Sequence, residues 1–577
     1  MPHKLFLSLL MSLFFISACS HFENLPTVPL GEGEVINEHE AFGHKYMMAT
    51  QGKLSTDAGR EILKRGGNLV DAAVAISFAL SVERPQSTGL GGGGFMLLAL
   101  PGWSSPIALD FREEAPMKAH EKMFLNQKGE VIPNLSSEGI FSGGVPGLVA
   151  GLTEVHQQFG KLPLKMVMSP AIRMAKNGFF VYPYLAHCLK ETQELLGKYP
   201  ASKKIFFHQD GSLLREGDLL VQKDLAKTLE LIAEKGKNGF YQGKVAEKIV
   251  LTQKKYGGLI TLNDLNQYRP RTRKPVHGTF KGYDIYSMGP PSSGGTHVIE
   301  ILNILENDPL KEFGAGSAMS VHQVAEAMKL AFVDRAAYMG DADFVSVPVK
   351  GLISKEYAHQ LREKIRPNKT LEVSSLQPGK ASSYESPETT HFTLMSSDGA
   401  VISSTQTING YFGSGIVIGD TGVLLNNEMD DFATKVGEQN IYGAVGGEKN
   451  LIEPKKRPLS SMSPSIVYEN NRPLLALGTP SGTRILTCVA QTLLNYLDYQ
   501  MPLYESLASV RFHHQWHPDE LWVEDPGLSV EVEKTLTDLG HHIKRKNLGC
   551  RIQAVALEKG TLHGVSDPRG EGTAGGE

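Results

Sequence analysis

The feature that most constrains the fold is an abrupt change of sequence pattern near position 388. Residues 367–387 are polar, rich in serine and proline, and show no hydrophobic period, which is typical of an exposed loop or linker. Directly after them, residues 391–396 and 400–408 have the pattern of two strands, and the Asp-Gly pair at 398–399 is a hairpin signal. Residues 388–391 therefore lie at the junction between a loop and a strand.

Hydrophobic patterns on both sides of this junction predict a layered fold. Asn68–Val82 is apolar on nearly all sides, which indicates a buried helix with Asn68 as its cap. Further segments follow helical or strand patterns: helices over 225–233, 321–338 and 483–497, and strands over 95–100, 415–419, 422–426, 464–468 and 473–477. Strand runs flanked by helical blocks favour helices packed on a sandwich of sheets.

Composition excludes several classes of protein. Of 577 residues, 41% are apolar and 21% charged, which rules out a disordered, collagenous or coiled-coil chain. The 58 basic and 62 acidic residues give a net charge of −4, and the absence of a long basic run argues against a nucleic-acid partner. The glycine run 91–94 is not followed by Gly-Lys-Ser/Thr, so we expect close backbone packing between a helix and a strand there and not a phosphate loop.

The N-terminus predicts export. A short basic start, an apolar stretch and small residues form a secretory signal. Ile16-Ser17-Ala18-Cys19 resembles a bacterial lipoprotein box, in which Cys19 is lipidated after cleavage; an ordinary signal peptide cut near Ser20 is the alternative. We expect a signal peptide over 1–18, a polar linker over 19–45, and a periplasmic or extracellular protein anchored to a bacterial membrane through Cys19. The three other cysteines, 188, 488 and 550, allow at most one disulfide.

Polar residues that follow the junction could carry chemistry. Thr389 and Thr390 alone fit the start of a strand. Thr405 and Thr407 lie two apart, so they share one strand face, on which Asn409 and Ser403 also fall. The segment 426–432, Asn-Asn-Glu-Met-Asp-Asp-Phe, is either a solvated acidic turn or a pocket for an ammonium group, because like charges so close need a cation.

Two turns add hydroxyl and backbone N–H groups. They are Pro458–Met462 and Gly478–Gly482, and the second opens the helix predicted from Thr483. The N–H groups at the start of a helix favour negative charge. Each signal is weak alone, but their order along the chain is informative.

In this order, the patterns resemble the gamma-glutamyltransferase (glutathione hydrolase) family of the N-terminal-nucleophile hydrolase superfamily. The resemblance extends from about residue 43 to 576. Its motifs in this sequence are Gly91–Phe95, Leu109–Glu113, Gly144–Gly147, Pro290–Gly295, Thr389–His391, Leu425–Phe432, Arg457–Met462 and Arg511–Gln515.

The resemblance implies a four-layer αββα sandwich, class α+β, built by two subunits cut from one precursor. The cut would separate Glu388 from Thr389, giving a large subunit over 46–388 and a small subunit of 577 − 388 = 189 residues. Thr389 would then be the nucleophile, with its own freed α-amine as base. It would attack the γ-glutamyl amide of glutathione and related compounds, and water, amino acids or peptides would accept the γ-glutamyl group.

The resemblance also assigns roles to other positions. Thr407 would orient the nucleophile, and Tyr442 would gate a lid over 434–450. The substrate α-ammonium would be held by Asn409, Glu428 and Asp431, its α-carboxylate by Arg112, Ser460 and Ser461, and the oxyanion by backbone N–H groups of Ser481 and Gly482. Ser481 departs from the family, which usually has glycine there; a serine at positive φ would be strained.

Two alternatives remain open, and no cofactor is expected. One alternative is a related cephalosporin (glutaryl) acylase that uses the same Thr389. The other is an unprocessed, non-catalytic surface lipoprotein. His513 and His517 have a spacing that could bind a metal, but the flanking Phe512 and Trp516 indicate a packed junction, and the resemblance implies no catalytic metal.

Overall fold

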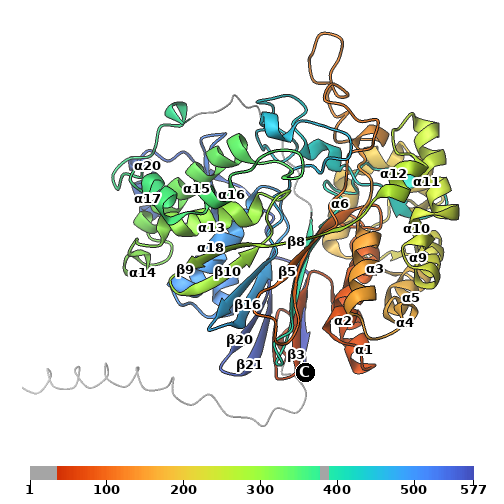
Figure 1. The fold of residues 1–577 in the computed structure, drawn as a ribbon, viewed down its shortest axis with the longest axis horizontal. Helices are drawn as coiled ribbons and strands as arrows, with labels where there is room; N and C mark the ends of the chain where they lie inside the picture. The colour runs from red at the N-terminus through yellow and green to blue at the C-terminus, as the bar shows by residue number, and fades with distance from the viewer. Residues whose placement is uncertain (1–34, 377–388) are drawn as a thin grey trace, which may run out of the picture.

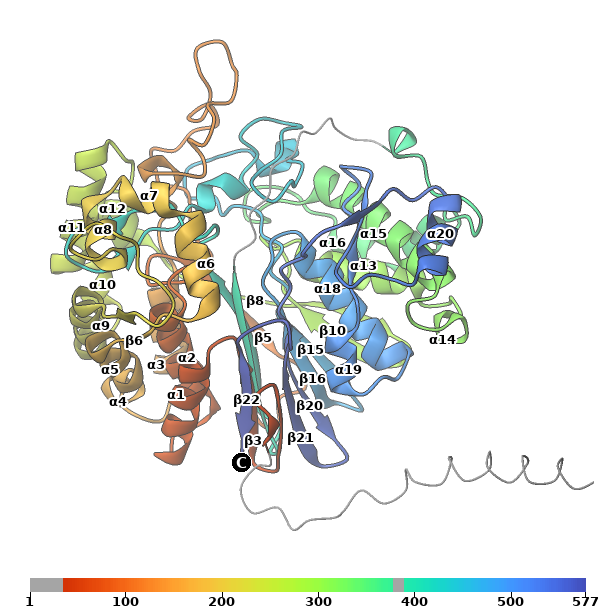
Figure 2. The same cartoon turned by 180° about the vertical axis from the view of Figure 1, so that it is seen from behind.

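The computed structural model describes residues 35–376 and 389–577. Two sheets lie face to face between two layers of helices (Figures 1 and 2), which confirms the predicted αββα sandwich. The signal peptide and Cys19 predicted at the N-terminus, and Glu388 at the predicted cut, lie outside the described residues.

Each main sheet combines strands from distant parts of the chain. Within the described residues the larger sheet has eight strands, in the order β1 (Val35–Asn37), β2 (Glu40–Gly43), β21 (Thr561–Ser566), β20 (Gln553–Glu558), β16 (Arg472–Gly478), β15 (Ser465–Glu469), β10 (Tyr283–Ser287) and β9 (Val276–Phe280). The other has seven, in the order β22 (Thr573–Gly576), β3 (Tyr46–Thr50), β11 (Thr390–Ser396), β12 (Val401–Thr407), β4 (Gly93–Ala99), β5 (Ile107–Asp110) and β8 (Arg271–Arg273).

Helices cover the outer face of each sheet (Figure 1). The layer on the seven-stranded sheet comprises α1 (Lys53–Lys64), α2 (Leu69–Glu83), α3 (Leu148–Phe159), α5 (Ser169–Asn177), α6 (Pro183–Glu191), α9 (Lys223–Lys235) and α11 (Gly243–Tyr256). The layer on the eight-stranded sheet, seen from behind in Figure 2, comprises α13 (Gly294–Leu305), α15 (Ala318–Tyr338), α17 (Lys355–Arg362), α18 (Arg484–Leu493), α19 (Leu503–Ala508) and α20 (Val530–Asp538).

The predicted buried helix is α2, and its start confirms the predicted cap. The Asn68 side chain accepts a hydrogen bond from the Asp71 N–H, and the Asp71 carboxylate accepts one from the Asn68 N–H. Every residue of α2 is buried, because the helix lies between the outer helices and strands β11 and β12. This reciprocal capping satisfies backbone donors that a buried helix end would otherwise leave unpaired.

Strand β4 shows how one strand contributes to two cores. Phe95 and Leu97 belong to the core that includes the space between the sheets, whereas Met96 and Leu98 pack in the core shared with α2. Side chains alternate along a strand, so a strand buried on both faces is apolar at every position. This explains why the sequence of β4 shows no polar alternation.

The glycine run before β4 packs closely on neighbouring backbone, as predicted. A Cβ on Gly91 would lie 1.9 Å from the Leu424 carbonyl oxygen, and one on Gly92 would lie 2.0 Å from that of Thr407. A Cβ on Gly94 would lie 2.3 Å from the Thr405 carbonyl oxygen. The neighbours are strand backbones and not a helix, and no larger residue fits against them.

Two predicted boundaries are wrong. The last part of the linker predicted over 19–45 contains β1 and β2, which extend the eight-stranded sheet by pairing β2 with β21. The predicted helix 483–497 changes at Leu494 into a π-helical turn, Leu494–Asp498. The first error arises because the partner of β2 lies more than 500 residues away in sequence, where no local pattern can indicate it.

A disulfide joins Cys488 in α18 to Cys550, which precedes β20, and Cys188 is buried in α6. The cross-link closes a loop of 62 residues, so the chain-entropy model assigns it about 4 kcal/mol. We predict that replacing both cysteines with alanine lowers the free energy of unfolding by about 2–4 kcal/mol, measured by denaturant titration. Alkylation of the denatured, unreduced protein should leave Cys488 and Cys550 unmodified; labelling of both would contradict the pairing.

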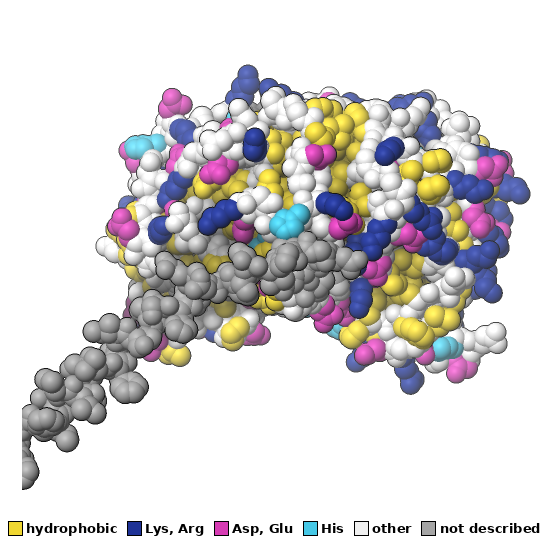
Figure 3. Space-filling model, turned by 90° about the horizontal axis from the view of Figure 1, so that it is seen from below, with side chains coloured by type: hydrophobic (Ala, Val, Ile, Leu, Met, Phe, Trp, Pro, Cys, Tyr) yellow, Lys and Arg dark blue, Asp and Glu magenta, His cyan; other side chains and the backbone are white. Residues whose placement is uncertain are grey.

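The surface carries charges of both signs, interspersed across the face in Figure 3. Among the described residues, no helix combines the length and apolar character that a membrane span requires.

Candidate active site

The site lies at one end of the two sheets, next to the start of β11, the end of β12 and the turn that follows β16. Strand β11 pairs with β12 in a register that places Thr390 opposite Gln406 and His391 opposite Thr405. Continuing this register by one residue places Thr389 opposite Thr407, the last residue of β12. Both threonines are buried, 4% and 3% exposed, and both line the same cavity.

This cavity unites most of the predicted site residues. Its volume is about 20 Å³, which is room for about one water molecule. Of the predicted residues it is lined by Arg112, Thr389, Thr407, Asn409, Asp431, Tyr442, Ser460, Ser461 and Gly482. Glu428 and Ser481 do not line it, but Glu428 pairs with Arg112 and Ser481 directly precedes Gly482, and both of these partners line the cavity. A γ-glutamyl group needs more room, so the cavity has to open before substrate enters.

A buried charge cluster occupies one wall of the cavity. Arg112, 1% exposed, follows β5, and its Nη1 lies 2.5 Å from Glu428 Oε2. Its Nη2 pairs with Asp431, and Glu113 Oε2 lies 3.7 Å from Nη1. The acidic segment 426–432 is therefore a buried charge site, and the alternative of a solvated acidic turn is wrong.

The cluster carries more carboxylates than positive charge. Burial raises the pKa of Glu113 to about 8 and holds the pKa values of Glu428 and Asp431 above their ordinary range, although the Arg112 guanidinium acts in the opposite direction. A ligand that brought an ammonium group would supply missing positive charge. A carboxylate on the same ligand could bind the Arg112 fork.

Neighbouring turns supply polar groups to the other walls. Asn409, at φ +76°, donates its N–H to Thr407 Oγ1 at 2.7 Å, which fixes the end of β12. Its side chain donates to the Asn427 carbonyl at 3.1 Å. The turn before β15 carries Ser460 and Ser461, and both residues line the cavity.

Sequence reasoning missed Arg335 and Asn440. Arg335 lies in α15, and its Nη2 donates to Ser461 Oγ at 3.1 Å. Burial lowers the pKa of Arg335 to about 10. Asn440 donates to Asp431 Oδ1 at 2.9 Å. The signal for Arg335 was a cation in a mostly apolar helix, which also carries Lys329. Asn440 had no local signal.

The segment predicted as a lid is packed against the cavity. Tyr442, 4% exposed, donates its hydroxyl to the Asn409 carbonyl at 3.0 Å. Gln515 donates to the Gly443 carbonyl at 3.1 Å and accepts from Thr483 Oγ1 at 2.8 Å, so it ties the lid to the start of α18. His513 bonds the same Gln515 at 2.9 Å, as expected for a packed junction.

The turn between β16 and α18 holds Ser481 at positive φ, where a serine is strained. Ser481 has φ +119° and Gly482 has φ +52°, so both residues adopt conformations that favour glycine. A Cβ on Gly482 would lie 2.1 Å from the Tyr442 ring. The Ser481 hydroxyl donates to the Leu548 carbonyl and accepts from Arg484 Nε at 3.2 Å. These bonds hold serine in a strained position.

Comparing two substitutions at Ser481 isolates this strain. Glycine removes both the strain and the hydroxyl, whereas alanine removes only the hydroxyl. We predict that Ser481→Gly is more stable than Ser481→Ala by about 1–2 kcal/mol, since a non-glycine residue in such a conformation costs about 1–3 kcal/mol. Thermal unfolding of the two variants checks this, and equal midpoints would show that the backbone is unstrained.

Comparisons with known proteins agree with this geometry. A sequence model described as Gamma-glutamyltranspeptidase matches residues 55–577. The glutathione hydrolase proenzyme of Escherichia coli (strain K12) is 45% identical over 533 residues, covering 92% of this chain and 91% of that protein.

Two solved structures are similar to this chain. The gamma-glutamyltranspeptidase of Helicobacter pylori is 45% identical, with a TM-score of 0.56, and the match covers 62% of this chain and 97% of that chain. The cephalosporin acylase of Bacillus halodurans is 27% identical, with a TM-score of 0.83, over 95% of this chain and 99% of that chain. The chain belongs to the gamma-glutamyltranspeptidase family.

Proposed function

We propose that this protein is a glutathione hydrolase and gamma-glutamyltransferase whose nucleophile is Thr389. The observation that carries the proposal is the position of Thr389, opposite Thr407 at a cavity that also contains Arg112 and Asp431. A hydroxyl thus lies beside paired groups of opposite charge, which suit the zwitterionic end of a γ-glutamyl compound. The family match over residues 55–577 supports the same activity.

The reaction follows from these groups. Cleavage between Glu388 and Thr389 frees the Thr389 α-amine, whose reference pKa of about 7.7–8.0 suits a base near neutral pH. The Thr389 oxygen attacks the γ-carbonyl, the amide C–N bond breaks, and the proton passes to the leaving nitrogen. Water or an amine then takes the γ-glutamyl group from the ester. Thr407 orients the nucleophile.

Recognition relies on the charge cluster. The substrate α-ammonium is bound by Asp431 and Glu428 together with Asn409, and its α-carboxylate by Arg112. Ser460 and Ser461 add hydrogen bonds to the carboxylate. Backbone N–H groups of Ser481 and Gly482 stabilise the oxyanion, a contribution of about 3–4 kcal/mol per donor in other enzymes. Tyr442 opens and closes the lid over 434–450.

The strand order explains how two cut fragments would stay together. In the seven-stranded sheet, β11 and β12 from the proposed small subunit lie between β3 and β4 from the proposed large one. In the eight-stranded sheet, four strands of the small subunit lie between β2 and β10. Separation would break hydrogen-bonded ladders in both sheets, so the product of cleavage at 388–389 is a stable heterodimer.

Export with a lipid anchor at Cys19 is part of the proposal. Its support is the sequence of the first 19 residues, which includes the Ile16-Ser17-Ala18-Cys19 box. The enzyme would then act in the periplasm or outside the cell. Labelling with a radioactive fatty acid tests this: the protein incorporates the label and Cys19→Ser does not, whereas equal labelling, or none, overturns the anchor.

The acylase alternative differs in substrate and is tested directly. The similarity to a cephalosporin acylase keeps it relevant. The proposed lid and the Arg112–Asp431 pair favour a γ-glutamyl group, because a glutaryl group lacks the α-ammonium. We predict that γ-glutamyl-p-nitroanilide is cleaved at least tenfold more efficiently, in kcat/KM, than glutaryl-cephalosporin, since loss of a charged hydrogen bond costs about 1.5–3 kcal/mol. The opposite preference would overturn the substrate assignment.

A further inference from the structure

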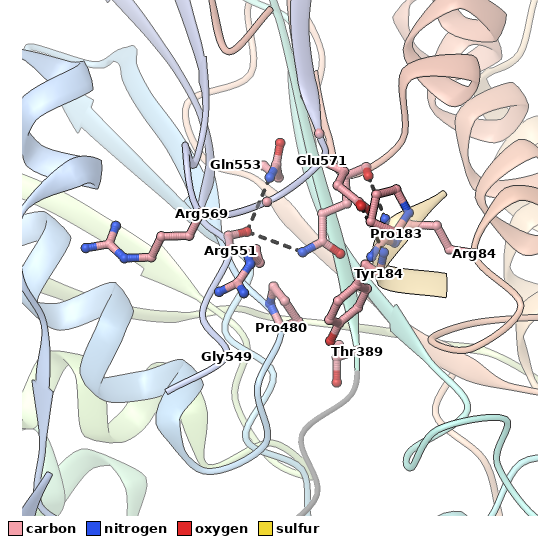
Figure 4. Close-up of a pocket in the computed structure, with 13 residues that line it drawn as sticks. Arg84, Pro183, Tyr184, Thr389, Pro480, Gly549, Arg551, Gln553, Arg569 and Glu571 are labelled. Atoms are coloured by element: carbon pink, nitrogen blue, oxygen red, sulfur yellow. Dashed lines mark hydrogen bonds between the residues drawn. The ribbon is translucent and has the colours of Figure 1, made fainter. Parts of the chain in front are cut away.

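Thr389 lies between two cavities, and γ-glutamyl binding accounts for only one of them. The second cavity has a volume of about 320 Å³, within the range of small-molecule sites. It shares Thr389 with the small cavity but is otherwise lined by different residues, including Arg551 and Tyr184. Figure 4 shows Arg551, Pro480 and Tyr184 around the space next to Thr389.

The wall that carries Arg551 is held firmly. The Arg551 N–H donates to Thr479 Oγ1 at 2.7 Å, and the Arg551 carbonyl accepts from Gln553 Nε2 at 3.3 Å. The preceding residue, Cys550, is fixed to α18 by the disulfide with Cys488. Because the backbone on both sides of Arg551 is already fixed, binding a ligand requires ordering of the side chain only.

The guanidinium of Arg551 keeps most of its binding capacity. Its Nη1 donates to the adjacent Cys550 carbonyl at 2.8 Å, and within residues 35–376 and 389–577 it forms no ion pair. Arg569, which also lines the cavity, is different: it pairs with Glu524 at 3.0 Å and Asp567 at 3.3 Å and points away in Figure 4.

The remaining charges leave the cavity positive. Arg84 donates to the Gln51 carbonyl at 2.9 Å and lies 5.6 Å from the centre of the Tyr184 ring. Glu571 is the carboxylate on this wall, and it accepts from the Tyr184 N–H at 2.9 Å. Among the residues that line the cavity, three are arginines and one, Glu571, is a carboxylate, and this composition favours an anionic ligand.

We propose that this cavity binds the peptide part of the substrates, and that Arg551 binds its C-terminal carboxylate. The inference rests on the proposed function, because it requires a γ-glutamyl ester on Thr389. The dipeptide released from glutathione and a dipeptide acceptor have the same chemistry. Each has an amine nitrogen that bonds to the γ-carbonyl carbon and a carboxylate on the following residue. An extended dipeptide spans about 7 Å, which suits a cavity of this size.

In the transfer step, the acceptor amine attacks the ester carbonyl from this side. The new C–N bond forms, the C–O bond to Thr389 breaks, and the amine proton passes to the Thr389 oxygen. Arg551 forms no bond to the reacting atoms. Its role is to position the acceptor.

The test compares two acceptors in two variants. Release of p-nitroaniline from γ-glutamyl-p-nitroanilide is measured against increasing glycylglycine or glycylglycine amide, which lacks the carboxylate. With the unchanged enzyme, glycylglycine has the lower KM. Arg551→Gln raises that KM about tenfold and removes the difference between the two acceptors, whereas Arg551→Lys, which keeps the charge, restores part of it. Hydrolysis of the anilide without acceptor stays unchanged, because its leaving group has no carboxylate.

The outcomes separate this inference from the proposed function. If the anilide is cleaved but Arg551→Gln leaves the preference for glycylglycine intact, the inference is wrong and the function stands. A parallel loss of anilide hydrolysis and of both acceptors would also overturn it, because Arg551 would then have a structural role only. If the unchanged enzyme cleaves no γ-glutamyl compound, both proposals fail.

Discussion

Thr389→Ala is expected to remain a single uncut chain without measurable γ-glutamyl hydrolysis. The variant lacks the hydroxyl that attacks the preceding carbonyl, so no cut occurs and no free α-amine is produced. Loss of a nucleophile costs other hydrolases about 10⁴-fold or more in rate. A denaturing gel and the anilide assay measure the two effects together.

Two variants control for folding. Thr389→Ser keeps a hydroxyl and should still be cut, at a lower rate. Thr393→Val lies in the same strand, and the Thr393 hydroxyl is buried without a hydrogen-bond partner among the described residues, so its replacement by a methyl group should leave cutting and stability unchanged. Cutting of Thr389→Ala would show that another residue is the nucleophile. A wild-type chain that stays uncut would favour the non-catalytic lipoprotein.

Arg112→Met is expected to produce the second large effect. It leaves Glu113, Glu428 and Asp431 buried without their shared cation, and removal of one partner of a buried ion pair costs about 3–5 kcal/mol. It also removes the proposed fork for the substrate carboxylate. We expect kcat/KM for γ-glutamyl-p-nitroanilide to fall at least about 100-fold, mainly through KM, since several charged hydrogen bonds are lost.

Arg457→Met is the matched control. Arg457 is also 1% exposed, and it pairs with Asp110 at 2.5 Å and Glu114 at 3.0 Å, but it does not line the cavity. Both variants should be destabilised to a similar extent in denaturant, and only Arg112→Met should raise KM strongly. Equal KM values in the two variants would mean that Arg112 has a structural role only.

Local signals were sufficient for much of the fold. The cap at Asn68 and the Asp-Gly hairpin between β11 and β12 are properties of a few consecutive residues, and both are present. The edge strand β2 could not be predicted, because it depends on pairing with β21 at the other end of the chain. The cysteine pair could not be chosen either, since sequence spacing does not reveal which thiols are adjacent in space.

The candidate site was predictable in its residues but not in its charge balance. The spacing of Thr405 and Thr407 indicated a shared face, yet only Thr407 reaches the cavity, while Thr405 bonds His391 at 2.8 Å between the sheets. The sequence suggested that the acidic segment needs a cation, but it could not show that Arg112 itself supplies it. Arg335 remained hidden because its neighbours in the sheet sandwich come from distant segments.

The central claim is that cleavage of the chain exposes Thr389 as a new N-terminus. Sequencing the N-terminus of the smaller fragment from purified, mature protein tests it most directly. The account predicts a single sequence that begins Thr389-Thr390-His391. A fragment that begins at any other residue would contradict the proposed chemistry.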